Sequence, residues 1–307
     1  MNILVTGASG EVGYGLIDGL SSGRNFITAL DIRPLEDVVE QKVDKAYVAD
    51  VTDAGAINRI VGRGEFDVVY HLASVLSTGG EKNPELAHRV NVYGTFNLLD
   101  SLRKAEAPVK FVYPSSIAVY GGGGKNLVPI TMYGINKLYC EGLGVYFSDY
   151  YKLLSEGGSN IDFRCVRFPG LISTKTMPTG GTTDYAPEVL HAAMKKQDYE
   201  CFVRRDSCLP FMAMEDGARA LVELARAPKK KLKKRIYDIG SFSAKAGDFE
   251  KAAKKIYPEM RVSYKVDEAR QRIVDSWPSE VDDKEARKDW GWKPRFGFVD
   301  TIRFFTG

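Results

Sequence analysis

Short apolar runs and helical patterns alternate through the first half of the chain. Runs of four to eight apolar or β-branched residues predict strands, whereas apolar residues spaced three and four apart predict helices. Strand patterns occupy 3–5, 26–31, 46–49, 66–73, 110–114 and 161–168, and the longest helical patterns occupy 85–105 and 134–154. This alternation predicts an α/β fold with a doubly wound parallel sheet, covered by helices on both faces.

The pattern becomes less regular after Pro169. Proline and glycine cluster between residues 169 and 181, and shorter elements follow as far as the C-terminus. We therefore expect residues 1–169 to form the sheet domain and residues 170–307 mainly a smaller C-terminal lobe. Residues 235–240 contain one more strand pattern, which could return to the main sheet.

The segment between the first strand and the first helix is rich in glycine and reads TGASGEVG over residues 6–13. Glycine permits a tight turn and close approach of the backbone to a pyrophosphate, and the helix N-terminus directs its positive dipole end at the phosphates. A glycine turn of no special function would need neither the strand before it nor the helix after it. The segment predicts a Rossmann-type dinucleotide site that includes Gly7, Gly10, Glu11, Val12 and Gly13.

Acidic residues follow the second and third strand patterns. Asp31 ends the second, where a carboxylate accepts hydrogen bonds from the adenosine ribose and repels a 2′-phosphate. NAD is therefore expected, although the nearby Arg33 could hold the extra phosphate of NADP. Asp50 and Val51 follow the third strand and could flank the adenine. Asp50 could instead cap the helix that begins after residues 52–53.

Tyr133 and Lys137 are four residues apart and share one face of the predicted helix. A free tyrosine has a pKa of about 10 and is a poor base at neutral pH. A nearby ammonium, together with the charge of oxidised nicotinamide, favours the phenolate. Lys137 could also bind the nicotinamide ribose. The spacing is common by chance, but behind a dinucleotide turn it indicates an oxidoreductase with Tyr133 as catalytic acid/base.

Composition excludes several other classes of protein. The 43 basic and 40 acidic residues give a net charge of +3, so nucleic acid is not an expected partner. The KKKLKKR run at 229–235 is expected to be a solvated loop, with an anion contact as the alternative. Four cysteines and three scattered histidines lack zinc-ligand spacing, which favours a reduced protein without a metal.

No apolar run approaches the roughly 18–20 residues that a membrane span needs. The first strand begins one residue after Met1, which leaves no room for a signal peptide. We therefore expect no membrane partner and a cytoplasmic location, unless an organellar targeting peptide has been removed.

The segment Ser115-Ser-Ile-Ala-Val-Tyr-Gly121 precedes Tyr133 and resembles the site of the extended short-chain dehydrogenase/reductase family. The resemblance implies that Ser116 binds the substrate oxygen beside Tyr133 and that the C-terminal lobe binds the substrate. It also implies further cofactor contacts at Leu72, Ala73, Asn91 and Pro169. Only 16 residues separate Ser116 from Tyr133, a shorter loop than is typical of this family.

Longer segments resemble one subfamily, the short-chain type of L-threonine 3-dehydrogenase. They include Gly170–Pro178, Gly180–Ala186, Asp275–Pro278 and Glu285–Trp292. The resemblance implies NAD-dependent oxidation of the threonine β-hydroxyl, with substrate contacts from Ser77, Thr182, Thr183 and Trp277 in addition to Ser116 and Tyr133. Residues 182–184 could instead cap a helix that starts near Tyr185, and Trp277 could be ordinary packing between the lobes.

The subfamily resemblance also implies a homodimer that pairs the helices at 85–105 and 134–154. These helices carry apolar residues beyond one face, namely Phe96, Leu98, Leu99, Leu138, Tyr146 and Phe147. Two other functions remain open on the same scaffold. One is a nucleotide-sugar epimerase or dehydratase, and the other is a non-catalytic NAD-sensing protein.

Overall fold

Seven parallel strands form the central sheet in a computed structural model that describes residues 1–62, 64–154, 158–178 and 180–306. The strand order is β10-β6-β5-β4-β1-β2-β3. The strands are β1 (Asn2–Thr6), β2 (Phe26–Asp31), β3 (Lys45–Val48), β4 (Val68–His71), β5 (Val109–Ser116), β6 (Ile161–Phe168) and β10 (Ile236–Asp238). The predicted doubly wound sheet is confirmed. The chain changes direction between β1 and β4, and such a switch point opens a crevice at the carboxyl ends of the strands.

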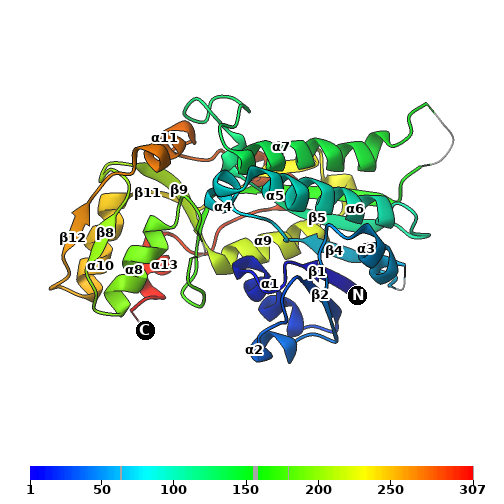
Figure 1. The fold of residues 1–307 in the computed structure, drawn as a ribbon, viewed down its shortest axis with the longest axis horizontal. Coiled ribbons are helices and arrows are strands. Elements are labelled where there is room, and N and C mark those ends of the chain that lie inside the picture. The colour runs from blue at the N-terminus through cyan, green and yellow to red at the C-terminus, as the bar shows by residue number, and fades with distance from the viewer. Residues whose placement is uncertain (63, 155–157, 179, 307) are drawn as a thin grey trace.

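Helices cover both faces of this sheet (Figure 1). The helices of this domain are α1 (Glu11–Ser21), α2 (Asp37–Glu40), α3 (Ala54–Val61), α4 (Ser77–Lys82), α5 (Pro84–His88), α6 (Gly94–Leu102), α7 (Met132–Val145) and α9 (Met214–Arg226). Successive side chains of a strand point to opposite faces. Ile3 and Val5 pack with α1 and α9, whereas Leu4 between them packs with α3, α6 and α7.

The two long predicted helices are present. A π-helical turn at Arg89–Tyr93 joins α5 to α6, and another at Tyr146–Tyr150 continues α7. Helix α7 begins where the Thr131 side chain accepts a hydrogen bond from the Gly134 amide at 3.1 Å, which places Tyr133 in its first turn. Threonine is a favoured capping residue because its oxygen satisfies an amide that the helix leaves unpaired.

The apolar residues expected at a dimer interface divide into two groups. Leu98, Leu99 and Phe147 are buried in the chain's own core beneath the two helices, so the prediction was wrong for these three. Side chains that face the core of a sandwich cannot also reach a partner. Phe96 and Tyr146 are exposed, and Leu138 is half-buried. The outer face of the helices also exposes Tyr93, Ile135, Tyr139 and Tyr150.

A smaller lobe packs around its own hydrophobic cluster. It contains a three-stranded sheet in the order β11-β9-β7 and a two-stranded sheet of β12 and β8. Its strands are β7 (Gly170–Ile172), β8 (Tyr199–Cys201), β9 (Cys208–Ala213), β11 (Phe242–Lys245) and β12 (Val262–Tyr264). Its helices are α8 (Tyr185–Met194), α10 (Ala246–Ile256), α11 (Glu268–Ser276) and α13 (Phe298–Arg303).

The chain beyond residue 170 crosses between the two parts more than once. Helix α9 packs on α1, and β10 pairs in parallel with β6. Ala286 of α12 (Lys284–Trp290) and Trp292 also belong to the core of the first domain. The structure therefore interleaves the two parts, and a single boundary at residue 170 stays a prediction. In the described ranges no helix is both long enough and apolar enough to span a membrane.

Helix α7 packs closely on β6, so alanine should have opposite effects on protein stability at two glycines of this helix. A Cβ at Gly144 would lie 2.2 Å from the ring of the buried Phe163, whereas a Cβ at Gly142 meets nothing within 4 Å. We expect Gly144→Ala to destabilise the protein by about 1–3 kcal/mol through overpacking. The matched control Gly142→Ala should stabilise it by about 0.5–1 kcal/mol through helix propensity. Urea denaturation measures both, and equal free energies of unfolding would contradict this packing.

Candidate active site

The glycine turn after β1 is built by close backbone contacts. Gly7 has a φ of +70° and donates its amide hydrogen to the Leu30 carbonyl at 2.9 Å. A Cβ there would lie 2.5 Å from the Ala73 nitrogen, and a Cβ at Gly13 would lie 2.6 Å from the Gly7 carbonyl oxygen. Only glycine fits these two positions. A Cβ at Gly10 would make one tight contact, with the Gly7 carbonyl oxygen at 3.2 Å, and would meet no other atom within 4 Å.

The start of α1 fits a pyrophosphate. Its N-cap is Gly10, which supplies no side-chain hydrogen bond, and Glu11 and Val12 are partly exposed there. The positive end of the helix dipole therefore remains directed at whatever occupies the crevice. The Ser9 Oγ is buried and has no hydrogen-bond partner among the described residues. An unpaired buried hydroxyl beside Gly10 fits a polar ligand.

Asp31 lies beside this turn and is almost fully buried. Its Oδ2 accepts a hydrogen bond from the Ser9 amide at 2.9 Å, and its Oδ1 accepts one from the Arg33 amide at 3.1 Å. The Arg33 guanidinium extends into solvent, with its Nε 3.9 Å from Asp31 Oδ1. The negative charge is thus fixed at the end of β2, whereas the positive charge is free to move.

Asp50 and Val51 have local roles in the structure. Asp50 accepts a hydrogen bond from the Thr52 amide at 2.8 Å and closes a turn, whereas Asp53 caps α3. The helix-cap alternative therefore applies to Asp53 and not to Asp50. Val51 is buried beneath Gly94, where a Cβ would lie 2.6 Å from its Cγ2.

The remaining predicted cofactor positions surround the crevice from the neighbouring strands. Leu72 follows β4 and donates its amide hydrogen to the Thr6 carbonyl at 3.0 Å, and Ala73 closes over Gly7. Asn91 binds both backbone polar groups of Val75, at 2.7 and 3.0 Å, so it shapes the segment after β4. Pro169 is buried directly after β6.

Tyr133, Lys137 and Ser116 converge at the carboxyl end of β5. The Lys137 Nζ donates a hydrogen bond to the Pro114 carbonyl at 2.7 Å and lies 5.5 Å from the centre of the Tyr133 ring. Ser116 ends β5, where its Oγ accepts a hydrogen bond from the Ala118 amide in the short turn Ile117–Val119. The structure thus brings together the three residues that the sequence proposed as catalytic.

Burial dominates the ionisation of these groups. It raises the pKa of Tyr133 to about 12, and a hydrogen bond with Ser116 acts in the opposite direction. It lowers the pKa of Lys137 to about 8. In the protein by itself, desolvation of the phenolate thus holds the pKa of Tyr133 above its ordinary value. The lowering expected from Lys137 together with oxidised nicotinamide stays a prediction.

Buried hydroxyls from two distant segments meet next to this site. Ser77 begins α4, and its Oγ lies 3.1 Å from the Thr182 Oγ1. One turn further along α4, a Cβ at Gly80 would lie 3.7 Å from the Tyr133 nitrogen. The helix that carries Ser77 therefore contacts the helix start that carries Tyr133. The hydroxyl pair bridges the first domain and the smaller lobe.

Residues 182–184 do not cap α8 through their side chains. Asp184 folds back and accepts hydrogen bonds from the Gly180 and Gly181 amides at 2.8 and 2.5 Å. Burial raises the pKa of Asp184, and these two amides act in the opposite direction. Thr183 packs against Gly170. The segment is therefore a loop ordered by its own aspartate, and this loop holds Thr182 against Ser77.

Trp277 is buried in the cluster of the smaller lobe, against which Tyr120 and Tyr133 pack. Its indole Nε1 has no hydrogen-bond partner in the described part of the chain. Ordinary packing between the lobes explains why the Trp277 ring is buried. It does not explain why the indole N–H is buried without a partner, because buried donors are normally paired. An unpaired indole N–H is suited to donate a hydrogen bond to a carboxylate.

Sequence reasoning missed how the short loop before Tyr133 is anchored. The Gly123 and Gly124 amides donate hydrogen bonds to the Ser276 carbonyl at 3.0 and 3.2 Å, and a Cβ at Gly124 would lie 2.4 Å from the Pro278 side chain. The available signal was the run of four glycines, which permits such close contact. The loop thus links Tyr133 to the segment that holds Trp277.

Histidine and cysteine residues do not form a metal centre in the described ranges. His71 lies between the Thr6 and Thr95 hydroxyls at 2.7 and 3.0 Å, and burial lowers its pKa to about 3. It is therefore a neutral core residue. All four cysteines are free thiols.

The fold and this site define a Rossmann-type α/β protein of the epimerase-like short-chain dehydrogenase class. The model of the NAD dependent epimerase/dehydratase family matches residues 3–240. The mitochondrial L-threonine 3-dehydrogenase of Bos taurus is 36% identical over 310 residues, which cover 98% of this chain and 80% of the bovine one. The chain therefore belongs to the NAD dependent epimerase/dehydratase family and uses NAD(H).

Solved structures agree over the whole chain. A partial consensus L-threonine 3-dehydrogenase superposes with a TM-score of 0.90 at 36% identity, covering 100% of this chain and 98% of its own. A monomeric L-threonine 3-dehydrogenase from a metagenome has a TM-score of 0.88 at 38% identity, covering 99% of this chain and 97% of its own. Both lobes of the chain therefore share their arrangement with these enzymes.

The buried Lys137 ammonium predicts a variant that is more stable and has a defined pH dependence. The lysine pKa falls from 10.5 to about 8 on folding, so the protonated side chain destabilises the fold fully below pH 8. This penalty disappears as the pH rises toward 10.5. The shift corresponds to about 3 kcal/mol, and the lost bond to Pro114 offsets about 1 kcal/mol.

We therefore expect Lys137→Met to be about 2 kcal/mol more stable than wild type at pH 7. The gain should vanish near pH 10. Urea denaturation at the two pH values measures this difference. A variant less stable than wild type at pH 7 would show that the ammonium is better solvated than its burial indicates.

Proposed function

We propose that this chain is an NAD-dependent L-threonine 3-dehydrogenase, which oxidises the β-hydroxyl of L-threonine to 2-amino-3-oxobutyrate. The observation that carries the proposal is the Ser77–Thr182 hydroxyl pair, held beside Tyr133 by α4 and by the Asp184-ordered loop. Hydroxyl groups of this kind suit the ammonium and carboxylate of an amino acid. The full-length similarity to L-threonine 3-dehydrogenases supports the same substrate.

The cofactor in this proposal is NAD, which accepts a hydride from the substrate carbon when bound. The pyrophosphate would lie on Gly10 and the start of α1, and Asp31 would accept hydrogen bonds from the adenosine ribose. The fixed carboxylate of Asp31 favours NAD over NADP, because a 2′-phosphate would be repelled there. Further contacts are proposed from Asp50, Val51, Leu72, Ala73, Asn91 and Pro169.

Side chains of the protein carry out the proton transfer in this proposal. Ser116 donates a hydrogen bond to the substrate hydroxyl oxygen and holds it beside Tyr133. The Tyr133 phenolate takes the hydroxyl proton as the general base. Lys137 stabilises that phenolate by its charge and binds the nicotinamide ribose. The Trp277 indole N–H and the hydroxyls of Ser77, Thr182 and Thr183 anchor the polar groups of the amino acid.

This function predicts NADH formation with L-threonine that depends on the Tyr133 hydroxyl. Tyr133→Phe should fold and bind NADH but lose at least about two orders of magnitude in kcat, since general-base catalysis contributes that much. NADH absorbance with L-threonine as substrate measures the rate, and NADH fluorescence measures binding. The matched control Tyr257→Phe, at the end of α10, should retain wild-type turnover.

The same assay separates the alternatives. Faster reduction of NAD with 3-hydroxybutyrate than with threonine would reject the amino-acid anchors. Faster reduction with serine would keep the anchors and reject threonine as the substrate. Conversion of a UDP-sugar without net NADH release would identify an epimerase. Turnover by Tyr133→Phe within tenfold of wild type would remove Tyr133 from the proposed role.

We further propose a homodimer in the cytoplasm, paired through the exposed outer face of α6 and α7. Phe96, Tyr139 and Tyr146 lie on this face, and their apolar surface would be removed from water in a dimer. We expect a dimeric mass in light scattering at micromolar concentration. The double variant Phe96→Glu/Tyr139→Glu should be monomeric because it would bury charges in the interface.

Val299→Glu is the matched control for the double variant, since Val299 is exposed on α13 in the smaller lobe. It should leave the dimer intact. A monomeric wild-type protein, as in the monomeric relative, would contradict this interface.

A further inference from the structure

A third residue shares the helix face of Tyr133 and Lys137. Glu141 follows Lys137 by four residues, so the three side chains lie one turn apart along α7. The Ser115 Oγ donates a hydrogen bond to the Glu141 Oε1 at 2.5 Å. Three successive residues of β5 thus contact three successive turns of α7. Pro114 binds Lys137, Ser115 binds Glu141, and Ser116 bonds with Tyr133.

Glu141 is held from its other side by an arginine of the neighbouring strand. Arg167 on β6 donates from Nε to Oε1 at 2.9 Å and from Nη2 to Oε2 at 2.7 Å. Arg167 and Ser115 are direct partners in the β5–β6 register. Such a two-point contact fixes both the position and the orientation of a carboxylate. Glu141 itself is 1% exposed, so it cannot exchange this partner for water.

The same arginine connects the cluster to the segments around the site. Its Nη1 donates to the Tyr120 hydroxyl at 2.9 Å, and that hydroxyl donates to Asp238 on β10 at 2.8 Å. Tyr120 directly follows the turn that carries Ser116. One buried carboxylate therefore ties the ends of β5 and β6 to the catalytic helix, and through Arg167 it reaches β10.

Glu141 also faces Lys137 as a charge. Burial lowers the pKa of Lys137, and Cys140, Cys165 and Glu141 act in the opposite direction. Burial raises the pKa of both thiols, and of the three groups Glu141 is the one in an ion pair, with Arg167. The titratable groups around the ammonium are His71 on β4, Tyr113 on β5, Tyr133, Cys140 and Glu141 on α7, and Cys165 on β6. The Arg167 charge on β6 contacts Glu141.

We propose that Glu141 is a positioning residue for the reaction: through Ser115 and Arg167 it sets the register of α7 on β5, and its carboxylate, one turn along α7 from Lys137, favours the buried ammonium. The expected effect on kcat rests on the proposed function. The expected effect on the Lys137 pKa does not depend on that function. Glu141 is assigned no contact with substrate or cofactor.

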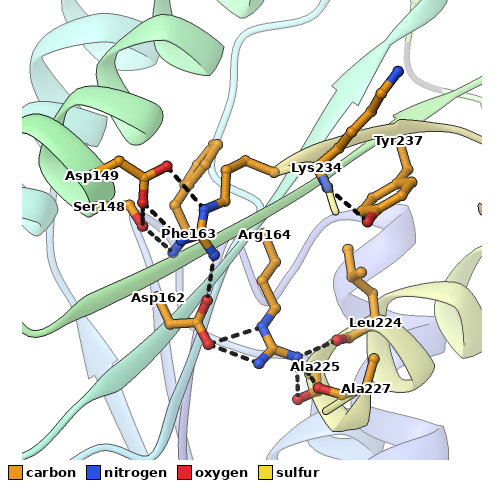
Figure 2. Close-up of polar contacts among 11 residues, drawn as sticks. Ser148, Asp149, Asp162, Phe163, Arg164, Leu224, Ala225, Ala227, Lys234 and Tyr237 are labelled. Carbon is orange, nitrogen blue, oxygen red and sulfur yellow. Dashed lines mark hydrogen bonds and ion pairs between the residues drawn. The ribbon is translucent and has the colours of Figure 1, made fainter. Parts of the chain in front are cut away.

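The matched control is a second buried carboxylate on the same strand as Arg167. Figure 2 shows Asp162, which accepts a hydrogen bond from Arg164 Nη2 at 2.7 Å. Asp162 also accepts one from Arg235 Nη1 at 3.2 Å. Arg164 also donates to the carbonyls of Leu224 and Ala227, both at 2.6 Å. Asp162 pairs with Lys110 in the register, five residues from Arg167, which is about 17 Å along a strand. Loss of this carboxylate reports on buried ion pairs away from Tyr133 and Lys137, because, among the described residues, its partner Arg235 reaches the α7 region only at Asp149, in the turn that follows the helix.

The first test is an NMR titration of the labelled Lys137 side chain in protein without NAD, assigned through Lys137→Arg. In Glu141→Gln the lysine should titrate at least about half a pH unit below wild type, because a neighbouring negative charge is gone and the Arg167 charge remains. In Asp162→Asn it should titrate as in wild type, although both variants lose thermal stability. An unchanged or higher lysine pKa in Glu141→Gln would overturn the proposal.

The second test uses Ser115→Ala, which removes the hydrogen bond from Ser115 to Glu141 and keeps the ion pair between Glu141 and Arg167. It can be carried out even if Glu141→Gln does not fold. We expect kcat for L-threonine to fall by about threefold to tenfold, the size of one misplaced hydrogen bond, with KM within twofold of wild type. Wild-type kcat in Ser115→Ala would overturn the positioning role. Wild-type protein inert toward L-threonine would contradict the proposed function instead, and the titration would then decide this inference.

Discussion

The burial of the Lys137 ammonium is the constraint around which the first domain is arranged. A charge in a protein interior is strongly unfavourable unless it is paired and hydrogen-bonded. Here the ammonium has the Pro114 carbonyl at 2.7 Å and the face of Tyr113, with the ring centre at 4.5 Å. Its aliphatic stem belongs to a helix that the glycine at 144 allows to lie directly on Phe163. A helix held further from β5 could not deliver the ammonium to that carbonyl.

The same closeness determines what the site can do. With Lys137 anchored on Pro114, the hydroxyl of Tyr133 is left to bond with Ser116, and burial raises the pKa of this phenol to about 12. In the proposed reaction, the charge of oxidised nicotinamide would favour the phenolate. A base that ionises only beside an oxidised nicotinamide is active only in the complete complex. The low dielectric that destabilises the buried lysine charge thus also makes the pKa of Tyr133 sensitive to a nearby charge.

The sequence was sufficient for those features that depend on local spacing. These features are the glycine turn, the strands of the central sheet and the four-residue spacing of Tyr133 and Lys137. Each is visible within a short segment of the sequence, and the structure contains all three. Features that depend on which way a helix faces were less accessible. Leu98 and Leu99 were expected at an interface because their apolar character is visible in the sequence, whereas their burial against β-strands of the same chain is not. The return of α9 to the first core was missed for the same reason, since its helical pattern shows an apolar face but not the elements that this face packs on. Trp292 lies in an irregular segment, which carries no periodic signal.

The candidate substrate site depends most on contacts that no local pattern encodes. Ser77 and Thr182 are 105 residues apart, and they meet because Asp184 orders a glycine loop that would otherwise have few constraints. The loop before Tyr133 is likewise fixed from outside, by the carbonyl of Ser276 next to Trp277. Both lobes therefore contribute to the positions of Ser77, Thr182 and Trp277, while the proposed catalytic groups belong to the first domain alone. A chain built this way can change its substrate through the loops that join the lobes without disturbing the buried charges that the chemistry requires.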